Sequence, residues 1–158
     1  MTTLPLEKLF HLSPNAYMVV DRELRYVAAN EAYLRITAST LDSLLGKHVL
    51  ERFPDDPADP NNASALLLRR SFERVLRTGK QDVLALLPYR VPARLDDGRV
   101  ELVDRFWSAT HTPLLDDHGE VAFIVQHTVD VTELHRLREA SAAAAAGHGG
   151  PLPHALEA

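Results

Sequence analysis

The 158-residue chain contains no cysteine. Without a thiol it can form no disulfide, no thiolate nucleophile, no cysteine–zinc site and no chromophore bonded to sulfur. It also has no apolar run near the roughly 20 residues that a membrane-spanning helix needs. Its opening sequence "MTTLPLEKLFHL" lacks the basic segment followed by an apolar segment that marks a signal peptide. We therefore expect a cytoplasmic protein that does not contact a membrane.

The chain has no excess of basic residues either. Seventeen Lys and Arg stand against 22 Asp and Glu, which gives a formal net charge of −5. A basic surface for nucleic acid is therefore not expected. Hydrophobic residues make up 46% and charged residues 25% of the sequence, as in ordinary globular proteins. The length suits one domain with a substantial core.

Several short helices are indicated in the first half of the chain. Leu6, Leu9 and Phe10 recur at helical spacing near the N-terminus. Asn30 precedes "EAYLRI" and Thr40 precedes "LDSLLGK", and both side chains can accept hydrogen bonds from the free amides of a first helical turn. We expect a helix after each of these two residues.

A longer helix is predicted for the segment "SALLLRRSFERVLRTGK", with Gly79 near its end. Its apolar positions share one helical face. They are Ala65, Leu68, Phe72 and Val75.

Five segments carry strand patterns. Two short ones, "AYMVVD" and "LRYVAAN", are joined by residues that suit a tight hairpin. Three longer ones are "DVLALLPYRV", "RVELVDRFWSATHTPLL" and "EVAFIVQHTVDV", separated by turns rich in Asp and Gly. Two strands, several helices and three more strands predict an α+β fold. Its five-stranded antiparallel sheet would have helices packed on one side, with an N-terminal helix and a C-terminal exit helix in addition.

This order of elements resembles the PAS domain, a sensory fold of the type found in bacterial sensor histidine kinases. The segments that carry the resemblance are "LFHLSPNAYMVVDRELRYVAANEAYLRIT", "LLGKHVLERFPDDP" and "FWSATHTPLLDDHGEVAFIVQHTVDVTEL". The resemblance covers about residues 4–137. It divides the chain into a PAS domain at 1–130, a signalling helix at 131–146 and a flexible tail at 147–158.

The resemblance implies a sensory or dimerisation module for bacterial signal transduction. Such a module binds a small ligand or transmits a conformational signal to an output partner, for example a histidine kinase, and it commonly forms a homodimer. It also implies a cavity on one face of the sheet, which the last strand lines with Ile124, Gln126 and Thr128.

The expected cavity has further walls. By the same resemblance, the neighbouring strand contributes Phe106, Ser108 and Thr110, with Thr112 beyond them, while Trp107 and His111 lie outside. Tyr89 is a further candidate for the lining. The polar groups of this wall are hydroxyls and one amide, without charge. They suit a neutral or weakly polar ligand, or a cavity filled by its own side chains.

The junction after the last strand is the candidate coupling joint, formed by Asp130, Thr132 and Glu133. Asp130 and Glu133 have the spacing of a capping box, in which the side chain of each residue accepts a hydrogen bond from the backbone amide of the other. Two interpretations stay open. The motif is a favourable helix start, or it couples changes at Gln126 and Thr128 to the exit helix.

The identity of any cofactor stays open. Haem-binding PAS domains usually carry their axial histidine on the long helix, which has none here, and a flavin–cysteinyl adduct is excluded. A non-covalent small ligand remains compatible with the sequence. No metal site is expected, because the Asp- and Asn-rich residues 55–62 lack the Gly and closing Glu of a calcium loop.

Nothing in the sequence indicates an enzyme. His135 lacks the residues that follow a kinase phospho-acceptor, and no ATP-binding glycine motif is present. Asp104, Ser108 and His111 do not share a strand face and so cannot form a catalytic trio. The alternative is a small cone-shaped α+β enzyme or carrier that acts on a hydrophobic metabolite. Such an enzyme needs a buried acid or base at the cavity, and the only candidate acids, Asp104 and Asp130, lie near strand ends.

Overall fold

The computed structural model describes residues 2–54, 58 and 63–147. The predicted Asp- and Asn-rich loop and the predicted tail lie almost entirely outside these residues. In chain order the elements are α1 (Leu6–Leu12), β1 (Ala16–Asp21), β2 (Tyr26–Ala29), α2 (Glu31–Ile36), α3 (Leu41–Leu44), α4 (Val49–Arg52), α5 (Ser64–Thr78), β3 (Asp82–Arg94), β4 (Val100–Leu115), β5 (Val121–Asp130) and α6 (Thr132–Gly147). The five strands form one antiparallel sheet in the order β2-β1-β5-β4-β3. The predicted α+β fold is confirmed.

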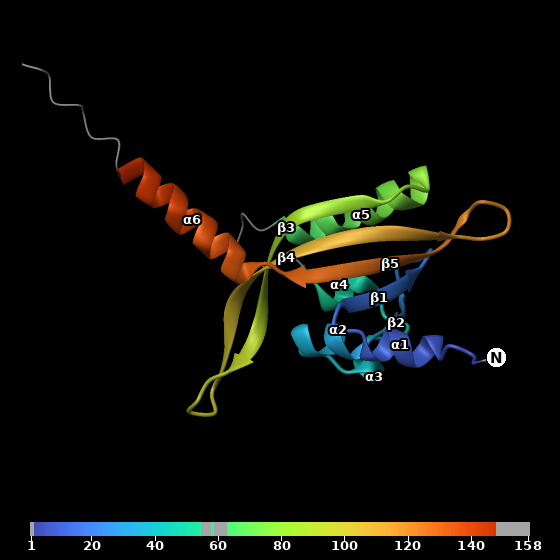
Figure 1. Cartoon of the computed structure of the whole chain (residues 1–158), viewed down its shortest axis with the longest axis horizontal. Helices are drawn as coiled ribbons and strands as arrows, with labels where there is room; N and C mark the ends of the chain where they lie inside the picture. Colours follow the sequence, from blue (N-terminus) through green and yellow to red (C-terminus); the bar gives the residue numbers. More distant parts are fainter. Residues whose placement is uncertain (1, 55–57, 59–62, 148–158) are drawn as a thin grey trace, which may run out of the picture.

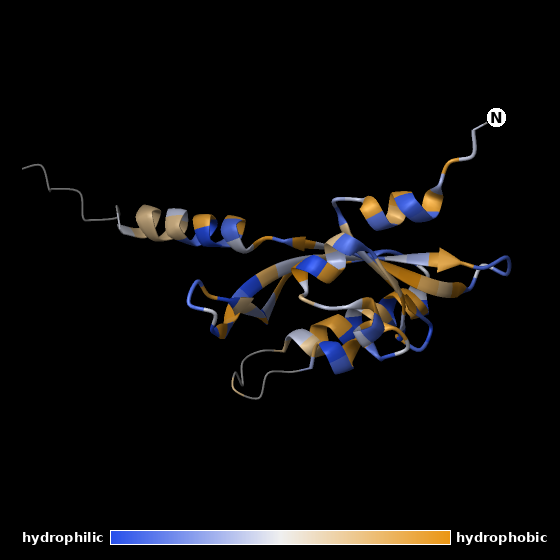
Figure 2. Cartoon of the chain, turned by 90° about the horizontal axis from the view of Figure 1, so that it is seen from below, coloured by the Kyte–Doolittle hydropathy of each residue, from blue (hydrophilic) through white to orange (hydrophobic). Residues whose placement is uncertain are grey.

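The helices divide between the two sides of the sheet. Helix α5 packs on one face, called here the inner face, and α1 lies on the opposite side, as Figure 2 shows. Helix α6 leaves the end of β5 and extends away from the sheet (Figure 1). No helix in the described part of the chain is long and apolar enough to cross a membrane.

The predicted helix caps are present. The Asn30 side chain accepts a hydrogen bond from the Tyr33 amide at 3.0 Å. Thr40 and Ser43 form a reciprocal capping box at the start of α3. Helix α5 ends at Gly79, whose φ of 65° is the left-handed conformation that glycine adopts most easily. These local signals fixed where the helices begin and end.

The hydrophobic core lies between the inner face of the sheet and the helices that cover it. The four residues predicted to form the apolar face of α5 are all buried. Phe72 is completely buried and stacks on the His111 ring of β4, with ring centroids 4.0 Å apart. The strands contribute Met18, Val20 and Ile124, which are also fully buried.

A β-bulge decides which side chains of β4 face the core. Near the β4–β5 turn Leu115 pairs with Val121, but the next pair is Leu114 with Phe123, so Ala122 is an extra residue on β5. A one-residue shift of register moves every side chain of one strand to the opposite face of the sheet, relative to its partner strand. His111 therefore pairs with Gln126. An unbulged hairpin would have placed Thr110 there, on the cavity face that was expected for it.

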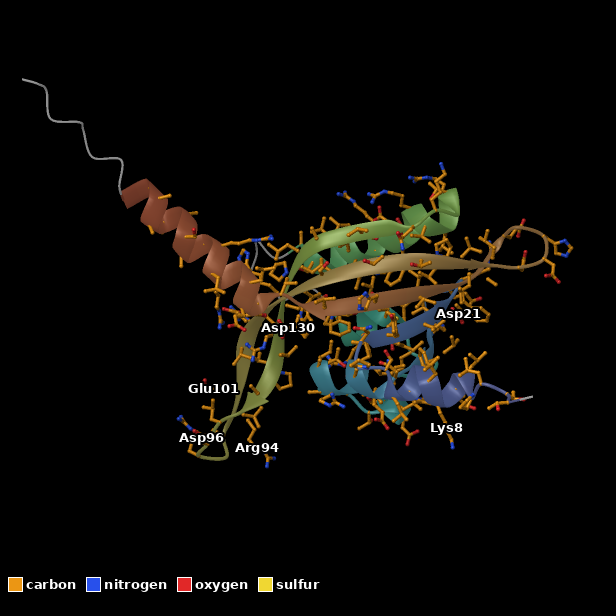
Figure 3. The ribbon with its side chains drawn as sticks, in the orientation of Figure 1. Lys8, Asp21, Arg94, Asp96, Glu101 and Asp130 are labelled. Atoms are coloured by element: carbon orange, nitrogen blue, oxygen red, sulfur yellow. The ribbon has the colours of Figure 1, made fainter. Side chains whose placement is uncertain are left out.

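Strands β3 and β4 continue together beyond the end of β5. The last pair of β4 with β5 joins Trp107 to Asp130, whereas pairing with β3 continues as far as Arg94 and Val100. This two-stranded ribbon projects from the sheet in Figure 1, and Figure 3 shows Arg94, Asp96 and Glu101 near its tip.

Candidate functional site

A cavity of about 30 Å³ lies between the inner face of the sheet and the helices. Its lining comes from α2 and the residue that follows it, the residue after α4, α5, and strands β3, β4 and β5. The lining residues are Tyr33, Thr37, Phe53, Leu68, Leu87, Tyr89, Trp107, Ala109, Gln126 and Thr128. A space of this size holds a few non-hydrogen atoms, since one water needs about 10–15 Å³ by the same measure.

Four of the seven predicted cavity residues lie on the inner side of the sheet. Gln126, Thr128 and Tyr89 line the cavity. Ile124 is completely buried on the same face of β5, but it packs in the core outside the lining.

The prediction for β4 was wrong. Phe106, Ser108 and Thr110 lie on the outer face, and Trp107 and Ala109 take their place in the lining. His111, expected outside, is completely buried behind Gln126. The cause is the extra residue Ala122, which shifts the pairing of β4 with β5 by one position and so turns the other face of β4 toward the core.

The hydroxyl groups of the lining are hydrogen-bonded within the wall. Tyr33 shares a hydrogen bond of 2.9 Å with Tyr26, and burial raises the pKa of Tyr26 to about 12 and that of Tyr33 well above its ordinary value. The Thr37 hydroxyl donates to the Tyr33 carbonyl at 2.8 Å, and Tyr89 donates to the Phe53 carbonyl. Tyr26 and Tyr33 are therefore neutral at physiological pH.

Six polar side chains form a continuous series from the surface of α5 to the cavity, called here the buried polar network. They are Arg74, Asp82, Ser71, His111, Gln126 and Thr128. Arg74 and Ser71 contact the Asp82 carboxylate at 2.8 and 2.6 Å. His111 Nδ1 lies 2.7 Å from Ser71 Oγ, and His111 Nε2 lies 2.8 Å from Gln126 Oε1. Gln126 Nε2 contacts Thr128 Oγ1 at 2.7 Å.

Two groups of the buried polar network have shifted pKa values. Burial lowers the pKa of His111 to about 4, although the Gln126 contact and the Asp82 charge oppose this shift. Burial by itself raises the pKa of Asp82, but the hydrogen bonds from Ser71 and Arg74 outweigh it and the pKa is lowered overall. At neutral pH the network therefore contains a neutral imidazole and an ionised carboxylate. No local pattern in the sequence indicates that His111 is buried, because its orientation depends on the bulge.

The junction between β5 and α6 is tied to β4 by backbone and side-chain contacts. The Phe106 amide donates to Thr132 Oγ1 at 2.9 Å, and the Val131 amide donates to the Phe106 carbonyl at 2.8 Å. The Phe106 ring also packs on His135 of α6, with centroids 4.1 Å apart. Figure 3 shows Asp130 at this junction.

The expected capping box is replaced by a different cap. Asp130 Oδ1 accepts from the Thr132 amide at 3.0 Å and also contacts the Thr132 hydroxyl. Within the described part of the chain, Glu133 makes no hydrogen bond to Asp130. The joint therefore rests on Asp130 and Thr132.

The lining contains little that could catalyse a reaction. Its titratable groups among the described residues are Tyr33 and Tyr89, and the pKa of Tyr33 is raised by burial. His111 is separated from the cavity by Gln126. No group of three or more metal-binding side chains occurs in the described residues.

Comparison with known proteins places the whole arrangement in one family. A family model described as "PAS fold" matches residues 10–136. No curated protein sequence matches the chain significantly. The chain is similar to the PAS domain of BvgS from Bordetella pertussis, with 26% identity over 85% of this chain and 95% of that one and a TM-score of 0.55.

Three further similar structures belong to two longer proteins. An RNA-binding Light-Oxygen-Voltage receptor matches with 20% identity and a TM-score of 0.58 over 89% of this chain, which spans 36% of the receptor. VqmA, a DNA-binding LuxR-type receptor from Vibrio cholerae whose dimer has been solved, matches with 24% identity and a TM-score of 0.57. That match covers 85% of this chain and 53% of VqmA. VqmA bound to DPO matches with 25% identity and a TM-score of 0.56, over 81% of this chain and 57% of VqmA.

Proposed function

The chain belongs to the PAS fold family, and from this premise we propose that it is a sensory and dimerisation module. It binds a small ligand in the cavity on the inner face of the sheet and transmits the change to an output partner through α6. A histidine kinase is the type of output that the sequence favours. The proposal places the protein in bacterial signal transduction in the cytoplasm, without membrane or nucleic-acid contact of its own.

One observation carries this proposal: strand β5, which forms part of the cavity wall, leads directly into the exit joint. Gln126 and Thr128 line the cavity, and Asp130 and Thr132 follow them without an intervening loop. A rearrangement of the wall by a ligand moves the residues that fix the start of α6. A switch of this kind needs a free-energy difference of only a few kcal/mol between its two conformations.

The pairing of two subunits is supported by the outer surface. The apolar residues Leu6, Leu9 and Leu12 of α1 are all more than half exposed. Phe123 of β5 and Leu114 of β4 lie exposed on the outer side of the sheet. Apolar surface of this kind on one side of a domain is typical of a protein–protein interface. We propose that a second copy of the chain covers it.

Native mass spectrometry of the full chain, purified without added cofactor, tests ligand binding and pairing together. We expect a dimer that retains one small molecule per subunit. A monomer without a retained molecule would contradict both parts of the proposal.

Charge substitutions localise the dimer contact. We expect Leu9→Glu to raise the dimer dissociation constant at least tenfold, because it places a charge in the proposed apolar interface. Leu67→Glu is the control, since Leu67 is an exposed residue of α5 on the other side of the sheet. Equal effects of the two substitutions would exclude α1 from the interface.

Thr132→Val tests the joint, because it removes, with little change of shape, the hydroxyl that accepts from the Phe106 amide and donates to Asp130 Oδ1. Each lost hydrogen bond of about 1 kcal/mol corresponds to roughly fivefold faster amide exchange where exchange requires this joint to open, so the loss of both predicts an acceleration of at least about fivefold. We expect this acceleration in the first turns of α6, measured by hydrogen–deuterium exchange. Thr110→Val, on the outer face of β4, is the control. If the α6 amides of Thr132→Val exchange as slowly as those of the wild type, Thr132 does not contribute to the coupling.

A further inference from the structure

The number of hydrogens in the buried polar network fixes the direction of its hydrogen bonds. The ionised Asp82 carboxylate can only accept, and it does so from Arg74 and from Ser71 at 2.6 Å. Ser71 has a single hydroxyl hydrogen, which this contact uses. At the 2.7 Å contact with His111 Nδ1, Ser71 is therefore the acceptor, and Nδ1 carries a hydrogen.

The second imidazole nitrogen then determines how the Gln126 amide is oriented. If His111 is charged, Nε2 also carries a hydrogen and donates to Gln126 Oε1, which is the orientation in the structure. If His111 is neutral, Nε2 is an acceptor and requires the amide NH₂ group instead. A half-turn of the terminal torsion exchanges the two ends of the amide, which have nearly the same size.

The surroundings of His111 favour the neutral form. Its ring is completely buried and stacks on Phe72, and loss of hydration disfavours a charged imidazole. The charged groups near it are Asp82, which it reaches through Ser71, and Arg74, which already pairs with Asp82 at 2.8 Å. Burial therefore holds the pKa of His111 at about 4, and a ring that is neutral at pH 7 requires the NH₂ group of Gln126 toward His111, the reverse of the orientation recorded in the structure.

The orientation of Gln126 determines what Thr128 offers to the cavity. With the NH₂ group toward His111, Gln126 Oε1 takes the place of Nε2, which lies 2.7 Å from Thr128 Oγ1 in the structure, and accepts the Thr128 hydroxyl hydrogen. Thr128 then has only oxygen lone pairs left. The hydroxyls of Thr37 and Tyr89 likewise already donate to backbone carbonyls.

We propose that Ser71 and His111 act as positioning residues that leave Thr128 as a hydrogen-bond acceptor toward the cavity. The ligand is then a small, mainly apolar molecule that donates a hydrogen bond through a hydroxyl or N–H group. This inference rests on the proposed function, because it names the ligand class of the same cavity.

The state of His111 can be tested without a ligand. Nitrogen-15 NMR of the full chain at pH 7 distinguishes the two neutral tautomers and the imidazolium. We expect a neutral ring with hydrogen on Nδ1. A ring with hydrogen on Nε2, or a charged ring, would overturn the proposal. Ser71→Ala removes the acceptor and should abolish the preference for Nδ1–H, whereas Ser64→Ala, a buried serine of the same helix, should preserve it.

Ligand preference can be tested with two isosteric probes, 2-propanol as a donor and acetone as an acceptor. Binding is followed through the NMR shift of the Gln126 side-chain amide. We expect 2-propanol to bind about tenfold more tightly, the size of one buried hydrogen bond. Ser71→Ala should reduce this ratio below threefold, and Ser64→Ala should not. Equal binding, or a preference for acetone, would contradict this inference alone. Binding of neither probe would contradict ligand binding in the cavity, and with it the proposed function.

Discussion

Acidification from pH 6.5 to below pH 4 is expected to lower the free energy of unfolding by about 3 kcal/mol through His111 alone. The pKa of His111 is about 4 in the folded protein and near 6.5 in the unfolded chain. Between these values the unfolded chain binds more protons, so stability falls as the pH falls. Above pH 6.5 this contribution is fully present, and below pH 4 it is lost.

Urea unfolding at pH 7.0, 5.5 and 4.0 measures this effect. Because carboxylates also titrate in this range, the quantity of interest is the difference in pH dependence between wild type and His111→Gln. His127→Gln is the matched control, since His127 lies on the outer face beside Tyr17 and its removal leaves His111 in place. If His111→Gln fails to fold, direct NMR titration of His111 in the wild type gives the same answer. A pKa near 6.5 there would contradict the expectation.

Phe72→Ala is expected to destabilise the fold by about 3–5 kcal/mol, the usual cost of removing a fully buried aromatic ring. The ring lies on α5 and covers one side of the His111 imidazole. Its loss leaves a cavity in the core and removes the apolar cover from the buried polar network. We also expect the pKa of His111 to move toward its ordinary value, because water can then reach the ring.

Thermal and urea unfolding measure the change in stability, and NMR titration of His111 measures the change in pKa. Leu66→Ala is the control, since Leu66 lies on the same helix and is 43% exposed. It should cost less than about 1 kcal/mol. A loss of similar size in both variants would show that α5 as a whole, and not the Phe72 contact, decides the stability.

Features set by short-range chemistry were predictable from the sequence. The caps at Asn30 and Thr40, the end of α5 at Gly79 and the apolar face of α5 each depend on residues within a few positions of one another. The α+β class and the five-stranded antiparallel sheet followed from the succession of these elements. The inward orientation of Gln126 and Thr128 came from the family resemblance.

Features that depend on contacts between distant segments were not predictable. Ser71 and His111 are 40 positions apart, and no local pattern indicates that they meet. The capping box at Asp130 was predicted from spacing alone. In the structure the nearer Thr132 donates hydrogen bonds to the Asp130 carboxylate instead, from both its amide and its hydroxyl.

The extra residue in β5 has a consequence for the alignment of relatives. Where a related strand pair lacks the equivalent of Ala122, its residues on β4 face the other way relative to β5. An alignment that keeps β4 and β5 free of gaps will then equate Trp107, Ala109 and His111 with positions on the outer surface. Ligand-contacting positions can therefore be transferred between members of this family only after the bulge has been located in each, and the correct offset is a single residue.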